Sequence, residues 1–120
     1  MKAEKIEFES IRAAEGALDR IGSSNSRIMA SRAVHVNVLV RQVPGDDARA
    51  LKRAYNEIGA EAAVSRQVYH EEKDAVTDMI VMGTVYQHRE VRRVLAANPA
   101  TKPWLDAIEG IVETAKETID

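Results

Sequence analysis

The stretch from Ala33 to Val43, AVHVNVLVRQV, decides the fold of this chain. Valine occupies every second position at its centre, and the residues between the valines are His35, Asn37, Leu39 and Arg41. Strict alternation of this kind predicts a β-strand with one apolar face and one semi-polar face. The valine face needs a cover of helices, whereas the other face is free to line a pocket.

Composition narrows the class of protein. The chain has 120 residues, the length of one domain with a single core. Seventeen Lys and Arg stand against nineteen Asp and Glu, so the net charge is -2, without the basic excess of nucleic-acid-binding proteins. No cysteine is present for disulfides or thiolate metal sites. Because the first ten residues are rich in charge and no apolar run is long enough to span a bilayer, we expect a cytoplasmic protein that binds neither nucleic acid nor a membrane.

The N-terminal part of the chain shows helical periodicity. Apolar residues recur at three- and four-residue spacing from Ala3 to Ile21, and Gly22 ends the pattern. Ser23 to Ser26 then forms a polar loop that leads toward the valine strand. We therefore expect an N-terminal helical extension over residues 1–30 and one domain over residues 31–120.

Two further helices follow the valine strand. Asp46 is suited to start the first of them, which ends near Gly59 to Glu61. The second, Arg89 to Ala97, is interrupted by Asn98-Pro99 because proline disfavours helical geometry in the residue before it. Pro103 suits the first turn of a continuation.

Between these helices, two runs predict a β-hairpin. Ala63 to His70 alternates in polarity, Glu71 to Asp74 forms a charged turn, and Asp78 to Tyr86 is apolar on both faces, as a central strand is. The alternative is a single long helix from Asp46 to Ala97, which is improbable in so short a domain. The tail from Val112 to Asp120 fits either an edge strand or the end of the last helix.

The order of elements is that of an α+β fold, the ferredoxin-like split βαβ with an antiparallel sheet and an extra N-terminal helix. From His35 onward the chain resembles the dimeric α+β barrel superfamily, and most closely its antibiotic biosynthesis monooxygenase-like branch. The segments that carry the resemblance are HVNVLVRQVPGDDARALKRAY, SRQVYHEEKDAVTDMIVMGTVYQ and REVRRVLAANPATKPWLDAI.

The resemblance implies a homodimer in which two sheets pack face to face. Each sheet then has its own helices on one side and the partner's sheet on the other. A homodimer also meets a physical requirement, because the second face of the sheet needs a cover and a chain of this length has few residues left to provide one. We expect Val34, Val36, Val38 and Val40 to meet the helices, and the residues between them to face the barrel interior.

The function implied by the resemblance is that of a cofactor-independent monooxygenase acting on an aromatic or quinol-type small molecule. Such a reaction needs an apolar pocket, a proton acceptor and polar groups that hold an anion. A neutral histidine is the base, an amide or guanidinium steadies the oxyanion, and aromatic rings stack on the substrate. The candidates are His35 and Asn37 as catalytic residues, and Arg41, Tyr69, Tyr86 and Trp104 as substrate-binding residues.

Functions other than that of a cofactor-independent monooxygenase are also compatible with the sequence. The haem-degrading branch is disfavoured, since Leu95 and Leu105 stand where its pattern has a tryptophan and a histidine. The histidines show no metal-ligand spacing. A non-catalytic ligand-binding or assembly protein of the same fold is the main alternative, and an interior filled by Met79, Met82 and the tyrosines would favour it. An all-helical adaptor is the third, and a structural role at a dimer seam is the alternative for His35.

Overall fold

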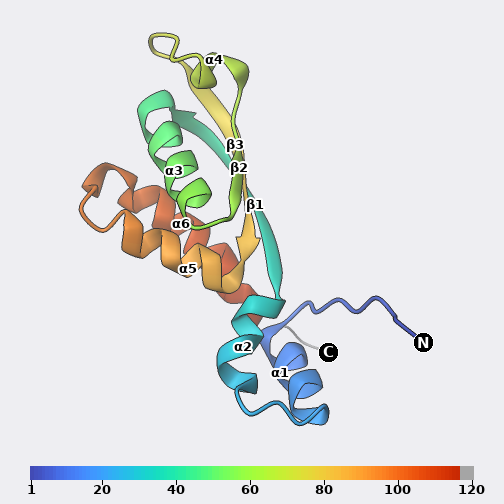
Figure 1. Ribbon diagram of the computed structural model, residues 1–120. Helices are drawn as coiled ribbons and strands as arrows, with labels where there is room; N and C mark the ends of the chain where they lie inside the picture. Colours follow the sequence, from blue (N-terminus) through green and yellow to red (C-terminus); the bar gives the residue numbers. More distant parts are fainter. Residues whose placement is uncertain (117–120) are drawn as a thin grey trace.

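The computed structural model describes residues 1–116, in which a small three-stranded sheet is combined with helices (Figure 1). The elements in chain order are α1 (Ile11–Arg20), α2 (Ser26–Ala33), β1 (His35–Pro44), α3 (Gly45–Glu57), β2 (Glu61–Ala63), α4 (Arg66–Tyr69), β3 (Val76–Thr84), α5 (Val85–Val94), η1 (Pro99–Thr101), α6 (Lys102–Val112) and η2 (Glu113–Lys116). The class is α+β, and both the single long helix and the all-helical bundle are wrong.

The sheet is antiparallel with the strand order β1-β3-β2. Leu39 of β1 pairs with Ile80 of β3, and Ile80 pairs with Ala63 of β2 on its other side. The central strand is therefore β3, and α3 connects two strands that are not neighbours. In the described part of the chain β1 is an edge of the sheet.

One face of this sheet is covered by α3, α5 and α6 (Figure 1). Val34, Val38 and Val40 are buried there, and Val36 is partly buried against the same core. The prediction that the alternating valines meet the helices is confirmed. Burial of these side chains, together with that of Val43, Met79 and Val81, stabilises the sheet against the helices.

The predicted strand over Ala63 to His70 is misplaced. The strand that pairs with β3 is Glu61–Ala63, and Arg66–Tyr69 forms one helical turn instead. Ser65 causes the change, because its Oγ accepts from the Val68 amide as an N-cap. The hairpin is therefore real, but its first strand is short and ends before the serine.

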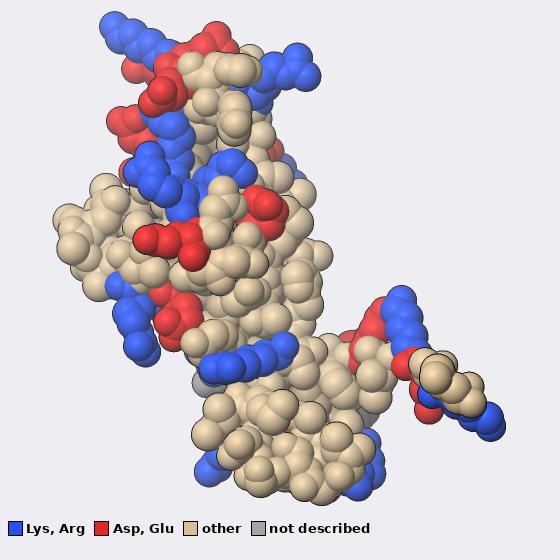
Figure 2. Space-filling model, in the orientation of Figure 1, with Lys and Arg blue, Asp and Glu red and all other residues tan. Residues whose placement is uncertain are grey.

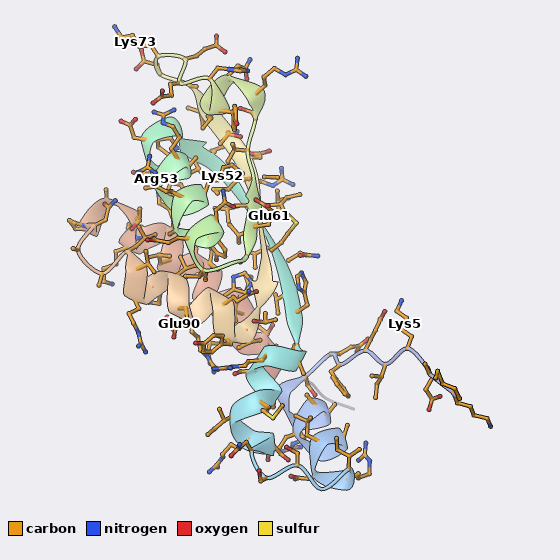
Figure 3. The ribbon with its side chains drawn as sticks, viewed as in Figure 1. Lys5, Lys52, Arg53, Glu61, Lys73 and Glu90 are labelled. Atoms are coloured by element: carbon orange, nitrogen blue, oxygen red, sulfur yellow. The ribbon has the colours of Figure 1, made fainter. Side chains whose placement is uncertain are left out.

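Figure 3 shows how α3 is tied to β2 by Lys52 and Glu61, which point toward one another. The Lys52 Nζ lies 3.5 Å from Glu61 Oε1 and donates to the Ala62 carbonyl at 2.6 Å. The lysine therefore holds the short strand against the helix layer by a backbone contact as well as a charge.

The N-terminal helices differ from the expectation. Helix α1 begins at Ile11, not near Ala3, because the Ser10 Oγ caps it by accepting from the Ala13 amide at 3.0 Å. The segment expected to lead into β1 forms α2, and α1 packs against α2 at one end of the molecule (Figure 1). At the other terminus, residues 113–116 form a 3-10 helix, so the edge-strand alternative is wrong for them. Residues 117–120 of the predicted tail lie outside the described residues.

A buried hydrogen-bonded chain joins the helix layer to the sheet. The Tyr55 hydroxyl lies 2.7 Å from His88 Nδ1, and His88 Nε2 lies 2.7 Å from the Val36 carbonyl oxygen. A carbonyl only accepts, so Nε2 carries the proton and donates, and Nδ1 accepts from the tyrosine. The neutral histidine thus connects α3, α5 and β1 through groups that are almost completely buried.

Replacing the tyrosine tests this connection. Tyr55→Phe removes the donor to His88 Nδ1 and leaves a buried acceptor unpaired, so we expect the free energy of unfolding to fall by about 1–3 kcal/mol in urea denaturation. The control is Tyr69→Phe, because Tyr69 is 66% exposed and its hydroxyl meets solvent. Equal stability of Tyr55→Phe and the wild type would contradict the role of the network.

Candidate functional site

The sheet face opposite the helices is open to solvent and carries most of the chemistry predicted for β1. We call it the open sheet face. The strand register sets Asn37 beside Met82, and Met82 beside Glu61, in one row across the sheet. A second row holds Leu39, Ile80 and Ala63. The residues of the face are His35, Asn37, Leu39, Arg41, Glu61, Ala63, Asp78, Ile80 and Met82.

His35 and Asn37 form a hydrogen-bonded pair at one end of this face. Alternation along β1 places them on the same side, and His35 Nε2 lies 2.9 Å from Asn37 Oδ1. The amide oxygen only accepts, so Nε2 donates. In the neutral ring this leaves the lone pair of Nδ1 free to take a proton, and it leaves the amide N–H groups of Asn37 free to donate.

Arg41 lies at the other end and is paired with Asp78. Their closest side-chain atoms, Nη1 and Oδ2, are 3.5 Å apart, and both side chains are exposed. The same carboxylate accepts from the Gln42 backbone amide at 3.0 Å. Gln42 has a φ of 58° at the point where the strand register shifts between Val40 and Val43. Asp78 therefore holds a β-bulge and partly neutralises the guanidinium.

The centre of the open sheet face is apolar. Leu39 is 50% exposed and Ile80 is 42% exposed, although each lies in the middle of its strand. They separate the histidine end from the Arg41–Asp78 end. Neighbouring apolar side chains left in water on a sheet face are typical of a surface that a ligand or a partner covers.

The three aromatic candidates lie elsewhere in the protomer. Tyr69 is on α4 and contacts His70 edge to face, with 5.5 Å between the ring centroids. Tyr86 lies in the first turn of α5, where the Arg32 guanidinium sits 4.2 Å from its ring centroid. The Trp104 Nε1 donates to Asp47 Oδ2 at 3.0 Å, which joins α6 to α3. The structure thus places His35, Asn37 and Arg41 on one sheet face, with Arg41 at the opposite end from the His35–Asn37 pair, and does not bring these aromatic rings to them.

The methionines also separate. Met79 is buried on the helix side of β3, whereas Met82 is partly exposed on the open sheet face. Among the residues that the structure describes, Met79 and Met82 therefore form no cluster on the open sheet face.

His88 is a titratable residue whose burial the sequence did not lead us to expect. In the sequence His88 stands directly before Arg89, Arg92 and Arg93, a charge pattern typical of a solvent-exposed helix face, yet only 4% of His88 is exposed. A signal was present, since Val85 and Val91 lie three residues to either side and all three share one helix face. Burial lowers the pKa of His88 below its ordinary value, although the hydrogen bond to the Val36 carbonyl acts in the opposite direction.

Comparisons with known proteins identify no relative. No protein-family model matches the chain, and neither a curated protein nor a solved structure does. Over residues 1–116, no three histidine or carboxylate side chains gather in a way that would hold a metal ion. None of the helices described is both long and apolar enough to cross a bilayer.

The pKa of His88 predicts how stability depends on pH. A histidine that stays neutral in the fold takes up a proton first in the unfolded chain, so its share of stability is complete above about pH 6.5 and is lost as the pH falls below that value. We expect urea denaturation to show a loss of up to about 1.4 kcal/mol per pH unit from this group.

The control separates His88 from other titrating groups. His88→Gln should flatten the dependence of the free energy of unfolding on pH between about pH 7.5 and about pH 5.5. The variant His70→Gln, at an exposed residue, should keep that dependence. The same slope in His88→Gln and the wild type would rule out the assignment.

Proposed function

We propose that two copies of this chain pair through their open sheet faces, as in the ferredoxin-like dimeric α+β barrels, and enclose a site for a weakly acidic aromatic small molecule. The observation that carries the proposal is the His35–Asn37 pair beside the exposed Leu39 and Ile80. It combines a proton acceptor, a free amide donor and an apolar floor on one surface.

The fold supports the pairing. With β3 between β1 and β2, the strand order agrees with that of the split βαβ arrangement. Helices cover only one face, so the other face loses its apolar exposure when a second sheet packs on it. A two-fold axis brings the same apolar centre from each copy together, which is the self-complementarity that a closed dimer requires.

The chemistry follows from the hydrogen bond within the pair. Nδ1 of His35 accepts the proton of a phenol or quinol, and the N–H groups of Asn37 donate to the oxyanion that forms. The anion is electron-rich and passes an electron to dioxygen. In an anthrone-type substrate, whose enol tautomer is such a phenol, oxidation of the ring methylene to a carbonyl then places one oxygen atom in the product, and the other leaves as water with the two methylene hydrogens. The substrate supplies the electrons, so the reaction needs no redox cofactor.

A non-catalytic ligand-binding or assembly protein is the second candidate. The observation that favours it is that Asp78 already pairs with Arg41, which leaves one cation fewer for an oxyanion. Both candidates share the dimer, and they differ in whether turnover occurs.

The dimer is tested by placing a charge at its centre. Light scattering after gel filtration at micromolar concentration should give the wild type about twice the 13.3 kDa protomer mass. Leu39→Glu buries an unpaired carboxylate in the interface and should give one protomer mass. Ile111→Glu is the matched control, since Ile111 is 52% exposed and lies on α6. A monomeric wild type would overturn the pairing.

The reaction is tested by oxygen uptake with a panel of hydroquinones and anthrones. Removal of the amide donor in Asn37→Ala should lower kcat by about 10²–10³-fold, and His35→Gln should lower it by a similar factor. The exposed Asn56→Ala on α3 is the control and should not change the rate. If no compound causes uptake while the dimer is present, the enzyme is excluded and the assembly protein remains.

A further inference from the structure

A second candidate site lies away from the open sheet face, between α1, α2 and the start of α5. A hollow of about 670 Å³ opens there. Its lining includes Arg12, Glu15, Arg27, Arg32, Tyr86 and Arg89. We call it the arginine groove. None of its lining residues belongs to the sheet, so it is distinct from the site proposed above.

Each helix contributes one face to the arginine groove. Arg27 and Arg32 lie five residues apart on α2, while Tyr86 and Arg89 lie three apart on α5. Arg12 comes from α1, which packs against α2. In Figure 2 the surface over this end of the molecule is mostly uncharged, with basic side chains at its margins. The fold thus gathers cations here from segments that are far apart in the sequence.

The groove is positively charged in a chain that is negative overall. The lining contains four guanidinium groups and a single carboxylate, that of Glu15, whereas the whole chain carries a net charge of -2. Arg89 has a distant partner, since its Nη2 lies 3.8 Å from Glu113 Oε1. Arg32 stacks on the Tyr86 ring, and Arg12 and Arg27 are exposed. The ion pairs found among residues 1–116 do not include Arg12, Arg27 or Arg32.

The residue types indicate the ligand. Guanidinium forks bind phosphate and carboxylate oxygens in pairs, and they do so most strongly where few other anions compete. The Tyr86 ring and the apolar side chains of Ile11 and Ile28 supply surface for an uncharged body. The hollow has the size of sites that hold small organic molecules.

We propose that the arginine groove binds a small organic anion, an apolar or aromatic body that carries one phosphate or carboxylate group. Three of the four arginines come from α2 and α5, whereas Glu15 comes from α1. The anionic group therefore lies against Arg27, Arg32 and Arg89, and the apolar body lies against the side chains of Ile11, Ile28 and Tyr86.

The test uses calorimetric titration with four probes: naphthyl phosphate, naphthoate, inorganic phosphate and naphthol. We expect one of the two organic anions to bind at least tenfold more tightly than naphthol and inorganic phosphate, and to weaken as salt is raised, because exposed charges are screened. The stronger of the two organic anions identifies the charged group. Inorganic phosphate binding as tightly as naphthyl phosphate would overturn the organic ligand.

Charge-reversed variants locate the binding. Arg27→Glu with Arg32→Glu should weaken the better probe at least tenfold, and the milder Arg32→Ala should weaken it in the same direction. The control is Arg53→Glu with Arg66→Glu, which changes the net charge equally at exposed residues of α3 and α4, remote from the groove (Figure 3 labels Arg53). Equal weakening by the control, or no binding of either organic anion at millimolar concentration, would overturn the proposal. Leu39→Glu should leave this binding unchanged, so failure here is separable from failure of the dimer.

Discussion

The hydrogen-bonded chain from Tyr55 through His88 to the Val36 carbonyl is the constraint on which the rest of this structure depends. It fixes α3 and α5 on the same side of β1, where the alternating valines are buried. An unpaired imidazole in this place would be costly, so the hydrogen bonds favour the arrangement in which the three elements pack together. Within residues 1–116 no helix covers the opposite side of the sheet, and the polar side chains of β1 that point there are exposed.

Strand β1 therefore serves two purposes with one alternating pattern. Its even-numbered valines hold the core, while His35 and Asn37 on the other side are positioned by the same backbone. Because the strand is anchored through the buried histidine, the distance between the imidazole and the amide is set by the sheet and not by a loop. The hydrogen bond to the Asn37 amide oxygen selects the tautomer of the His35 ring. It leaves Nδ1 of His35 as an unused acceptor and the amide N–H groups of Asn37 as unused donors.

The sequence predicts this strand well because its periodicity is local and both of its faces have a physical reason. It fails where tertiary contacts or a single cap outweigh the pattern. Ser65 ends β2 and starts a helical turn, although residues on either side favour strands. His88 looks like one of several exposed cations until the valines around it show that it faces the core. Tyr86 and Trp104 have the right chemistry for a pocket, but their helices direct them to Arg32 and Asp47 instead. Such partners are distant in the chain, and composition carries no information about them.

The bulge at Gln42 also affects how the exposed edge of the sheet can associate with other protein chains. In the described part of the chain β1 is an edge strand, and an exposed edge invites other chains to add strands without limit. The residue with a φ of 58° breaks the regular repeat of backbone donors and acceptors, and Asp78 holds that break in place. An incoming strand can follow the edge only as far as Val40 before its register is lost. The bulge thus guards the protein against fibrous aggregation while the six residues before it (from His35 to Val40) remain regular.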